Sequence, residues 1–548
     1  MLDVLIIGGG PHALTLASLL NSLDPVQDSD REDDSRISNP HLSNLETFKH
    51  KQKPTISESN VCTPLSVLVV DTYGKWAGLW ESQFTALHIP HLRSHTLVHT
   101  DPLNKNALQE FVLKYDRSAE LHSLPDHVQI LDENAFFNDM RLGKKERRRL
   151  NVTSTLKKSL SFSLPGTKLS VDFFKEQVKR YKLDKILLKG TVEHIIPVKV
   201  HPRKKVEHFC VELQDGSILR ARQVVLATGP TRVQMSNIPE WVKSIEESYP
   251  EGRLQHTVHL MHKPPNSKQR LQEMDCPGQE ETSSGQVCEA GQRVMVVGGG
   301  LTSAHVVSIA LQQGADHVTW VMRKHLQLKQ FDVGDVESLV GRYSHVEHGI
   351  KMDGQSYLRQ FYNERSLHKR LAMIRQARKG GAITPEAYIH LQPFIQSGQV
   401  NLNWAPVQVN EASWCYRSQS WNLSLSTRDH WTGDRIWLAT GCKLDVKQDP
   451  LLSDVMKNFP IQVIEGWPCI LESLQWTGGC PLYLMGQYSA LQVGPHAVNL
   501  AGGQAASMRI AKNIPHHQMQ DRGRDSEMGR GKSKTEEYIQ QMKGLFWL

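Results

Sequence analysis

Two glycine-rich segments have the residue types and spacing that bind a dinucleotide. The first, DVLIIGGGPHALTLASLL (residues 3–20), is typical of a buried strand, a tight turn and an apolar helix. Gly8 permits the turn, Gly10 lets the backbone approach a pyrophosphate, and Ala13 is small enough for the helix to pack on the strand. Pro11 begins the helix, whose free N–H groups would face the phosphates.

The strand expected next, LSVLVVD, ends at Asp71, where a carboxylate can hold a ribose hydroxyl. The usual gap between the glycines and this acid is about twenty residues, and here it is much longer. Residues 24–64 are polar, Ser-rich and acidic at the front. Treating them as an insertion between the helix and the second strand restores the usual spacing.

The second segment, RVMVVGGGLTSAHVVSIALQQGA (residues 293–315), repeats the pattern. Gly298 and Gly300 take the roles of the first two glycines, and Ser303 takes the third small position. The strand that follows ends in Arg323 and Lys324, with no acid. A cation at this place favours the 2′-phosphate of NADP over the ribose of NAD, although Arg323 can also be read as a solvated surface charge.

Short β-branched runs alternate with helical stretches over the rest of the chain, which predicts an α/β fold with parallel sheets. One of the helical stretches is residues 163–183, where Phe173, Phe174 and Val178 share an apolar side. Residues 24–64, 263–290 and 513–548 carry too little apolar surface to offset chain entropy. We predict a disordered insert, a linker and a polar tail for these three segments.

Composition excludes several function classes. In 548 residues, 64 Lys and Arg stand against 57 Asp and Glu, and the net charge of +7 is too dilute to predict nucleic-acid binding. No apolar run is long enough to span a membrane, and the first strand begins at residue 2 without a signal-peptide pattern, so we expect a cytoplasmic location. The eight cysteines contain no CxxC pair, and no His and acid cluster has metal-ligand spacing, so we predict no metal.

Two short motifs and one longer segment form a recognisable pattern together with the two glycine-rich units. LATGP (226–230) and LATGC (438–442) each follow an apolar strand, and PLYLMGQYSALQVGPHAVNLAGGQAASMRI (481–510) reads as a strand, a Gly-Gln turn and a helix rich in small residues. In this order they resemble the class B flavin-dependent monooxygenases, which include the N-hydroxylating ornithine and lysine enzymes. The chain is also similar to the oxidative stress-induced growth inhibitor proteins.

The resemblance implies two Rossmann-like dinucleotide-binding domains, with an NADPH domain inserted in an FAD domain. The FAD domain would comprise residues 1–235 and 435–512, and the NADPH domain residues 291–434. The resemblance adds cofactor-binding residues to those predicted above. For FAD they are Thr228, Gly229, Gly486, Gln487 and Gly494, the last near the flavin ring, and for NADPH they are Thr440 and Gly441.

The segment KWAGLWESQFTALHIPHLRSHTLVHTDP (75–102) stands where these enzymes approach the flavin. An apolar and aromatic wall would exclude water from a reactive flavin intermediate. The candidates for lining this flavin cavity, each of which can also be read as core packing, are Trp76, Trp80, His91, Arg93, Ser94 and His99.

The resemblance implies an FAD- and NADPH-dependent monooxygenase that forms a C4a-(hydro)peroxyflavin with O2 and oxygenates a soft nucleophile, an amine nitrogen or a sulfur. The cofactor performs the difficult step, and no catalytic residue is predicted. Two alternatives stay open. One is an NADPH-dependent flavin reductase or oxidase that releases peroxide, and the other is a non-catalytic regulatory protein that binds a protein partner through the insert or the tail.

Overall fold

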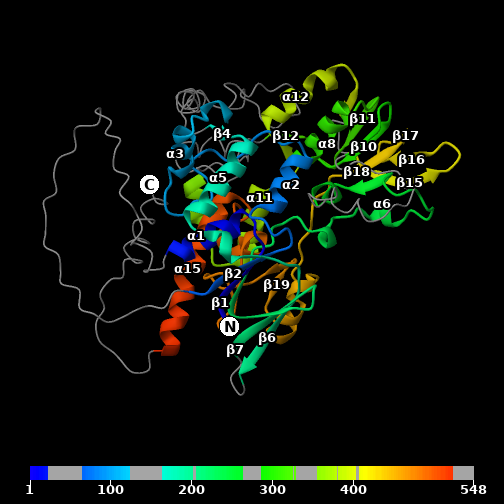
Figure 1. The fold of residues 1–548 in the computed structure, drawn as a ribbon. Helices are drawn as coiled ribbons and strands as arrows, with labels where there is room; N and C mark the ends of the chain where they lie inside the picture. The colour runs from blue at the N-terminus through cyan, green and yellow to red at the C-terminus, as the bar shows by residue number, and fades with distance from the viewer. Residues whose placement is uncertain are drawn as a thin grey trace, which may run out of the picture.

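The computed structural model describes residues 1–22, 65–123, 163–200, 205–262, 286–324, 326–328, 354–378, 381–402 and 407–522. They form two units, each built on a parallel or largely parallel sheet, and the predicted α/β class is confirmed (Figure 1). Within these ranges, no helix is long and apolar enough to cross a membrane. The predicted insert at 24–64 and most of the predicted linker lie outside the described residues.

The first unit is built around β1, which has a parallel neighbour on each side. Val4, Leu5 and Ile6 of β1 are fully buried, because helices and loops cover both faces of the sheet, and this explains why its strands read as aliphatic runs. The strands of this sheet are β1 (Leu2–Ile7), β2 (Val67–Asp71), β5 (Leu187–Lys189), β6 (Val192–Val200), β7 (Lys205–Leu213), β8 (Ile218–Leu226), β21 (Gln475–Thr477) and β22 (Cys480–Leu484).

Three helices, α1 (Pro11–Ser22), α5 (Thr167–Arg180) and α15 (Leu500–Arg522), belong to this unit. The predicted apolar side of α5 is confirmed, since Phe173, Phe174 and Val178 are buried. The polar tail predicted from residue 513 begins later than expected, because α15 continues to Arg522 and the side chain of Ile514 is fully buried.

The second unit has a five-stranded parallel sheet, which lies at the upper right of Figure 1. Its central strand, β10, is followed by the helix α8 (Leu301–Gln312), and α12 (Pro385–Gln396) packs beside α8. The strands are β9 (Leu254–His256), β10 (Arg293–Val297), β11 (His317–Val321), β14 (Val400–Leu402) and β18 (Arg435–Leu438), and a separate antiparallel sheet contains β15 (Val409–Cys415), β16 (Ser420–Leu425) and β17 (His430–Gly433).

The predicted boundary between the domains at residue 435 is wrong by one strand. β18 forms a parallel pair with β10, so residues 435–438 complete the second sheet. The second unit also begins before the predicted linker, because β9 pairs with β18. Val287 and Cys288, at the end of that linker, are buried in the hydrophobic core of the second unit.

The two chain crossings between the units run side by side. Ser236 and Cys442 form an antiparallel bridge, and the N–H of Asn237 donates to the carbonyl of Gly441 over 2.9 Å. Further along, the guanidinium of Arg232 forms an ion pair with the fully buried carboxylate of Asp449. The crossings are therefore one paired structure, not two independent linkers.

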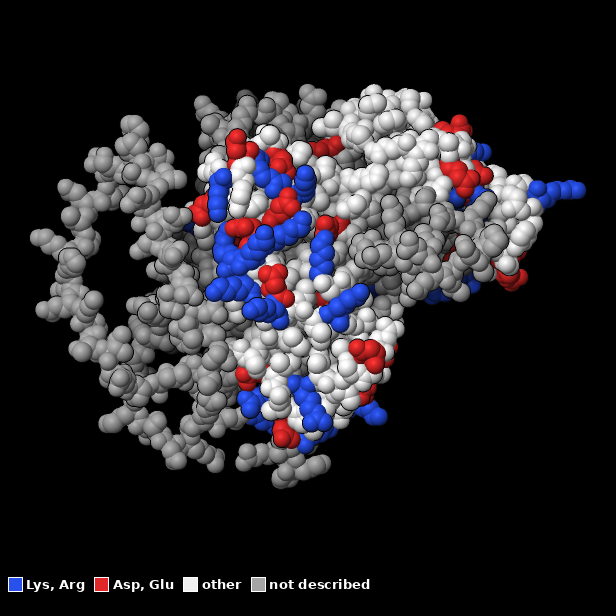
Figure 2. Space-filling view, viewed as in Figure 1, with Lys and Arg blue, Asp and Glu red and all other residues white. Residues whose placement is uncertain are grey.

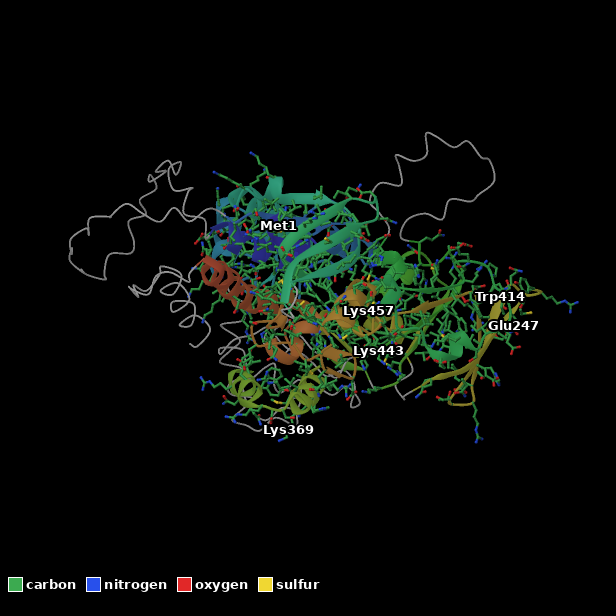
Figure 3. The ribbon with its side chains drawn as sticks, turned by 90° about the horizontal axis from the view of Figure 1, so that it is seen from below. Met1, Glu247, Lys369, Trp414, Lys443 and Lys457 are labelled. Atoms are coloured by element: carbon green, nitrogen blue, oxygen red, sulfur yellow. The ribbon has the colours of Figure 1, made fainter. Side chains whose placement is uncertain are left out.

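A pair of helices from the second half of the chain packs back on the first unit. α10 (Gly354–Asn363) and α11 (Leu367–Ala377) bring Phe361, Leu371 and Ile374 into the hydrophobic core of the first unit. Figure 3 shows α11, marked by Lys369, at the edge of the molecule opposite Met1. Arg370 donates from Nη1 to the carbonyl of Leu491 over 3.0 Å.

The remaining elements are short. They are α2 (Gly78–Ala86), α3 (Ala107–Lys114), η2 (Ser118–Glu120), β3 (Leu121–His122), β4 (Leu164–Pro165), η5 (Leu183–Ile186), η6 (Val233–Met235), α6 (Glu240–Lys243), α7 (Val258–Met261), β12 (Gln327–Leu328), β13 (Ala382–Ile383), η7 (Pro450–Leu452), α13 (Ser453–Asn458), β19 (Val463–Ile464), β20 (Trp467–Pro468), η8 (Gly486–Ser489) and α14 (Ala490–Val493).

The positive charge on the face shown in Figure 2 is interleaved with acids. Lys and Arg side chains gather over α5 and the segments beside it, among red Asp and Glu side chains. Arg117 pairs with both Glu120 and Asp172, and Lys175 also pairs with Asp172. These partly exposed pairs leave this face with alternating charge.

Candidate functional site: a cavity between the two units

A cavity of about 1460 Å³ lies between the two units. This exceeds the roughly 300–1,000 Å³ of a typical small-molecule pocket, so it has room for more than one ligand. Both units contribute to its wall. The first unit and the crossings contribute Ile7–His12, Val70–Tyr73, Gly78–Trp80, Gln83, Phe84, His88–Ser94, His122, Gly190–His194, Ala227–Gln234, Pro450, Leu451, Met485, Gly486 and Val498–Leu500. The second unit contributes His262, Leu301, Ala304, His305, Ser308, Gln312, Thr384, Glu386, Ala387, His390 and Leu391.

The first glycine turn lies on this wall with the geometry that the sequence predicts. Gly8 has a φ of 102°, and a Cβ there would lie 2.6 Å from the carbonyl oxygen of Ala227. A Cβ on Gly10 would meet nothing within 4 Å, so the backbone is open to a ligand there. Pro11 also faces the cavity, whereas Ala13, on the same helix α1, is fully buried. These features fit a bound pyrophosphate.

Asp71 ends β2 on the cavity wall, as predicted. Its Oδ2 accepts the N–H of Gly9 over 2.8 Å, and its Oδ1 accepts the N–H of Tyr73 over 2.8 Å. Burial raises the pKa of this carboxyl, and the two backbone N–H groups oppose that rise. Asp71 therefore orders the glycine turn, and its contact with a ribose stays a prediction.

The second glycine turn repeats the same contact. Gly298 has a φ of 142°, and a Cβ there would overlap the carbonyl oxygen of Ala439, while Gly300 faces open space. The Ser303 hydroxyl donates to the carbonyl of Gly300, which fixes the first turn of α8. Arg323 and Lys324 follow β11 and are exposed outside the cavity wall, and their contact with the 2′-phosphate stays a prediction.

The two ATG motifs lie in different surroundings. Thr228 and Gly229 are on the cavity wall, as expected for residues beside FAD. Thr440 instead donates its hydroxyl to the carbonyl of Asn237 over 2.6 Å, and Gly441 accepts from the N–H of Asn237. Within the described part of the chain, Thr440 and Gly441 belong to the paired crossings and not to the cavity wall, and their contact with NADPH stays a prediction.

The segment after β22 contributes to the wall at its two ends. Gly486, with a φ of 67°, faces the cavity, whereas Gln487 does not. Gly494 lies behind the wall, where an added Cβ would be 3.4 Å from the ring of His496. Residues 498–500 return to the wall at the start of α15.

Four of the six predicted cavity residues line the cavity, namely Trp80, His91, Arg93 and Ser94. Trp80 stacks on Phe84 at 3.8 Å between ring centroids, which gives α2 an aromatic face. Trp76 and His99 are corrections. Trp76 is buried in the core and its Nε1 donates to the carbonyl of Leu183 over 3.4 Å.

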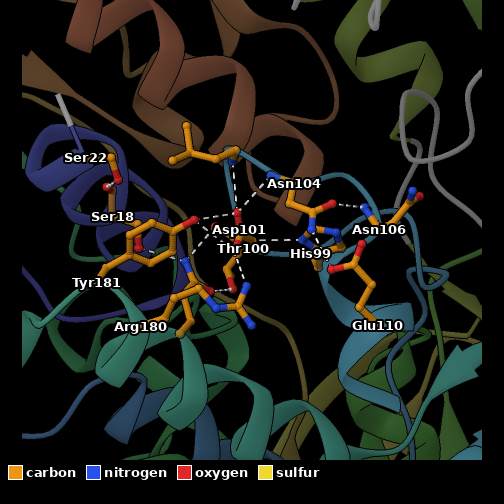
Figure 4. Close-up of polar contacts among 12 residues, drawn as sticks. Ser18, Ser22, His99, Thr100, Asp101, Asn104, Asn106, Glu110, Arg180 and Tyr181 are labelled. Carbon is orange, nitrogen blue, oxygen red and sulfur yellow. Dashed lines mark hydrogen bonds and ion pairs between the residues drawn. The ribbon is translucent and has the colours of Figure 1, made fainter. Parts of the chain in front are cut away.

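His99 belongs to a buried polar network centred on Asp101, which Figure 4 shows in close-up. The Nε2–H of His99 donates to the carbonyl of Lys105 over 2.9 Å, and burial lowers the pKa of this ring. The carboxylate of Asp101, fully buried, accepts from Arg180 over 3.0 Å and from the Tyr181 hydroxyl over 2.9 Å. The network fixes the segment that carries His91, Arg93 and Ser94 against α5.

Sequence reasoning missed several residues of the wall, among them His12 and Arg232. The Nε2–H of His12 donates to the carbonyl of Asn499 over 2.8 Å, and burial lowers the pKa of the ring. The sequence did point to His12, because it lies within the first glycine-rich motif. Arg232 lies three residues after Gly229, and its partner Asp449 also accepts from the Tyr488 hydroxyl over 2.8 Å. Only the folded chain brings Asp449 to Arg232.

The described residues contain no group of three or more His, Cys, Asp or Glu side chains that could hold a metal ion. The chemical features of the cavity wall are the first glycine turn, the aromatic face of α2 and several histidines.

Comparisons with known proteins agree with this architecture. Residues 104–376 match the family model described as pyridine nucleotide-disulphide oxidoreductase. Among solved structures, the ornithine hydroxylase of Pseudomonas aeruginosa is 14% identical with a TM-score of 0.58, over 94% of this chain and 100% of that one. The L-lysine 6-monooxygenase of Pseudomonas syringae is 14% identical with a TM-score of 0.56, over 94% and 99%. This chain has the fold of the flavin-dependent N-hydroxylating monooxygenases.

The ornithine N-hydroxylase of Kutzneria sp. 744, whose structure is described with reduced FAD, NADP⁺ and L-ornithine, is 15% identical with a TM-score of 0.55 over 94% of this chain and 100% of that one. A comparison with curated proteins finds no matching sequence. The predicted resemblance to this monooxygenase fold is confirmed, and the family model that matches residues 104–376 describes a pyridine-nucleotide oxidoreductase.

Proposed function

We propose that this chain is an FAD- and NADPH-dependent monooxygenase that transfers one oxygen atom of O2 to an amine nitrogen or a sulfur. The observation that supports this most is the cavity between the units. Its wall contains the first glycine turn, at Gly8 and Gly10, and the start of the helix that follows the second, at Leu301 and Ala304. Two cofactors can therefore meet in one cavity.

The residues of the chain have separate roles in this proposal. Gly8 and Gly10 leave room for the FAD pyrophosphate, and Asp71 holds the turn and one ribose. The N-terminus of α8 binds the NADPH pyrophosphate, and Arg323 with Lys324 binds the 2′-phosphate. When bound, FAD supplies the redox chemistry with NADPH and O2. The stacked rings of Trp80 and Phe84 exclude water from that part of the cavity.

The reaction balances with these reactants. NADPH, a proton, O2 and the substrate give NADP⁺, water and the oxygenated substrate. An amine is favoured as the nucleophile, because the Kutzneria relative of the same fold is described with L-ornithine. Sulfur nucleophiles remain within the proposal, since the chemistry requires only a polarisable lone pair.

The experiment measures where the electrons of NADPH go. The purified protein with FAD is mixed with NADPH, oxygenated buffer and a panel of primary amines and thioethers, and NADPH loss, hydrogen peroxide and oxygenated product are quantified. We expect at least one compound to give product in proportion to NADPH consumed, with ¹⁸O from labelled O2. Peroxide equal to NADPH with every compound would make the chain an oxidase. Failure to bind FAD would support a non-catalytic role.

A further inference from the structure

Five histidines from both units line one part of the cavity. His88, His91 and His122 come from the first unit, and His305 on α8 and His390 on α12 come from the second. His88, His122 and His390 are exposed at the opening, whereas His91 and His305 are partly buried. The rings of His91 and His122 are 4.7 Å apart between centroids. We call these five residues the histidine cluster.

The protein satisfies only part of the hydrogen-bonding capacity of these rings. The Nδ1–H of His88 donates to Oε1 of Gln312 over 3.1 Å, and the Nδ1–H of His91 donates to the carbonyl of Leu92 over 3.0 Å. Nε2 of His390 lies 3.1 Å from the hydroxyl of Ser308. The ring of His305 has no hydrogen-bond partner among the residues that the structure describes. Its ring nitrogens face the cavity and are therefore available to a ligand.

The imidazoles of the cluster oppose one another's protonation. Burial, and then the neighbouring rings of His91, His390 and His88, lower the pKa of His305 to about 4. Burial and His91 also lower the pKa of His122. Charge repulsion of this kind is relieved when an anion lies among the rings, because each imidazolium then faces an opposite charge.

Other charged groups near the cluster do not supply that anion. Arg93 extends from the same segment as His91, and Glu386 lies on α12 one helical turn before His390. The charges of Arg93 and Glu386 cancel, and both side chains already interact within the protein. Gly298 and Gly300 are not among the wall residues, but His305 follows Ala304 on α8, so the cluster lies beside the helix that the second glycine turn begins.

We propose that the histidine cluster binds an oxyanion, a carboxylate or phosphate group of a small-molecule ligand, and takes up protons as it does so. His305 contacts the oxyanion directly, and His91 and His390 complete the site from the two units. Identifying the ligand as the molecule that is oxygenated rests on the proposed function; the charge of the bound group does not.

The test uses the protein loaded with FAD and NADP⁺, so that the nucleotide phosphate sites are filled, and inorganic sulfate as the probe. Sulfate keeps its charge throughout the range between about pH 5.5 and 7.5, on either side of the ordinary histidine pKa of about 6.5. Calorimetry in buffers of different ionisation enthalpy gives the affinity and the protons taken up. We expect sulfate to bind at least about tenfold more tightly at the lower pH.

Two variants and one control make the result specific. His305→Gln and the exposed His390→Gln should each abolish most of the pH dependence, and the second cannot fail through loss of a core residue. His194→Gln is the matched control, because His194 lines the same cavity but pairs with Asp454 at 3.4 Å, outside the cluster. The control should bind sulfate as the unchanged protein does.

Three results would overturn the inference. They are binding that does not vary with pH, an equal loss in the His194→Gln control, and tighter binding of tetramethylammonium than of sulfate. Loss of sulfate binding only when NADP⁺ is present would assign the cluster to the nucleotide. None of these readouts depends on oxygen transfer, so the anion site and the proposed monooxygenase can fail separately.

Discussion

At the residue scale, a single methyl group decides whether either glycine turn can form. The backbone of Gly8 adopts a φ of 102° against the carbonyl of Ala227, and Gly298 repeats this against Ala439. Gly10 and Gly300 face open space instead. These four glycines look equivalent in the sequence but are needed for different reasons. Gly8 and Gly298 are required by the packing of the protein itself, and Gly10 and Gly300 by the space that a ligand occupies.

Replacing Gly8 and Gly10 separates these requirements. We expect Gly8→Ala to destabilise the fold by about 1–3 kcal/mol through overpacking and to lose FAD. Gly10→Ala should keep the stability of the unliganded protein and weaken FAD by at least about tenfold, since its methyl occupies the space of the pyrophosphate. Urea unfolding and FAD fluorescence quenching measure the two effects. Equal destabilisation by both variants would contradict this assignment.

Arg323 and Lys324 should determine the preference between nicotinamide cofactors. With both changed to Ala, we expect NADPH to bind about 10- to 100-fold more weakly, while NADH binding changes little, because only NADPH carries the 2′-phosphate. Flavin reduction rates at varied cofactor concentration report both affinities. A parallel loss for the two cofactors would show that the 2′-phosphate binds elsewhere.

Stability should fall in mild acid because of buried neutral histidines. Burial lowers the pKa of His496 and of His256 to about 4, from the ordinary value of 6.5. The unfolded chain therefore binds protons that the folded chain refuses, and the free energy of unfolding decreases as the pH falls from 6.5 towards 4. His496→Gln should flatten this dependence in urea unfolding at several pH values, and the exposed His194→Gln should leave it unchanged.

At the element scale, the sequence predicts strands and helices well where burial dictates a pattern. The aliphatic run of β1 and the spacing of Phe173, Phe174 and Val178 on α5 each leave one interpretation. The extent of α15 was underestimated, because polar residues after 513 hide a helix that is anchored through Ile514. Trp76 shows the corresponding limit for the site, since a tryptophan near a cavity and one in a core have the same sequence signal.

Two adjacent glycines in α15 allow close packing that no periodicity predicts. A Cβ on Gly502 would overlap the carbonyl oxygen of His496, and one on Gly503 would overlap the ring of His12. We expect Gly502→Ala to cost about 1–3 kcal/mol, measured by urea unfolding, because backbone must move. Ala505, partly buried on the same helix, offers a control as Ala505→Ser, which should change stability far less.

At the scale of the whole molecule, the paired crossings set the relation between the units. Sequence motifs located both crossings, but the boundary at 435 was wrong because strand β18 precedes the second ATG motif and belongs to the inserted sheet. The pairing of Arg232 with Asp449 had no sequence signal. It depends on a contact between segments that are distant along the chain.

Removing the charge of Asp449 should weaken this structure strongly. In Asp449→Asn the buried guanidinium of Arg232 loses its counter-charge, and we expect a loss of about 3–5 kcal/mol in unfolding experiments. The exposed pair of Arg375 with Glu465 provides the comparison. Glu465→Gln should cost less than about 1 kcal/mol, and a similar loss in both variants would mean that burial is not the cause.

The position of β22 has a consequence for the synthesis of the protein. β22 pairs in parallel with β8, yet the whole second unit lies between them in the sequence. During translation, domains generally fold as units as they emerge from the ribosome. The inserted unit can therefore be complete while the first sheet still waits for its last strand. The nascent chain would acquire its nicotinamide site before its flavin site, and ribosome-bound chains that end before β22 should bind NADPH but not FAD.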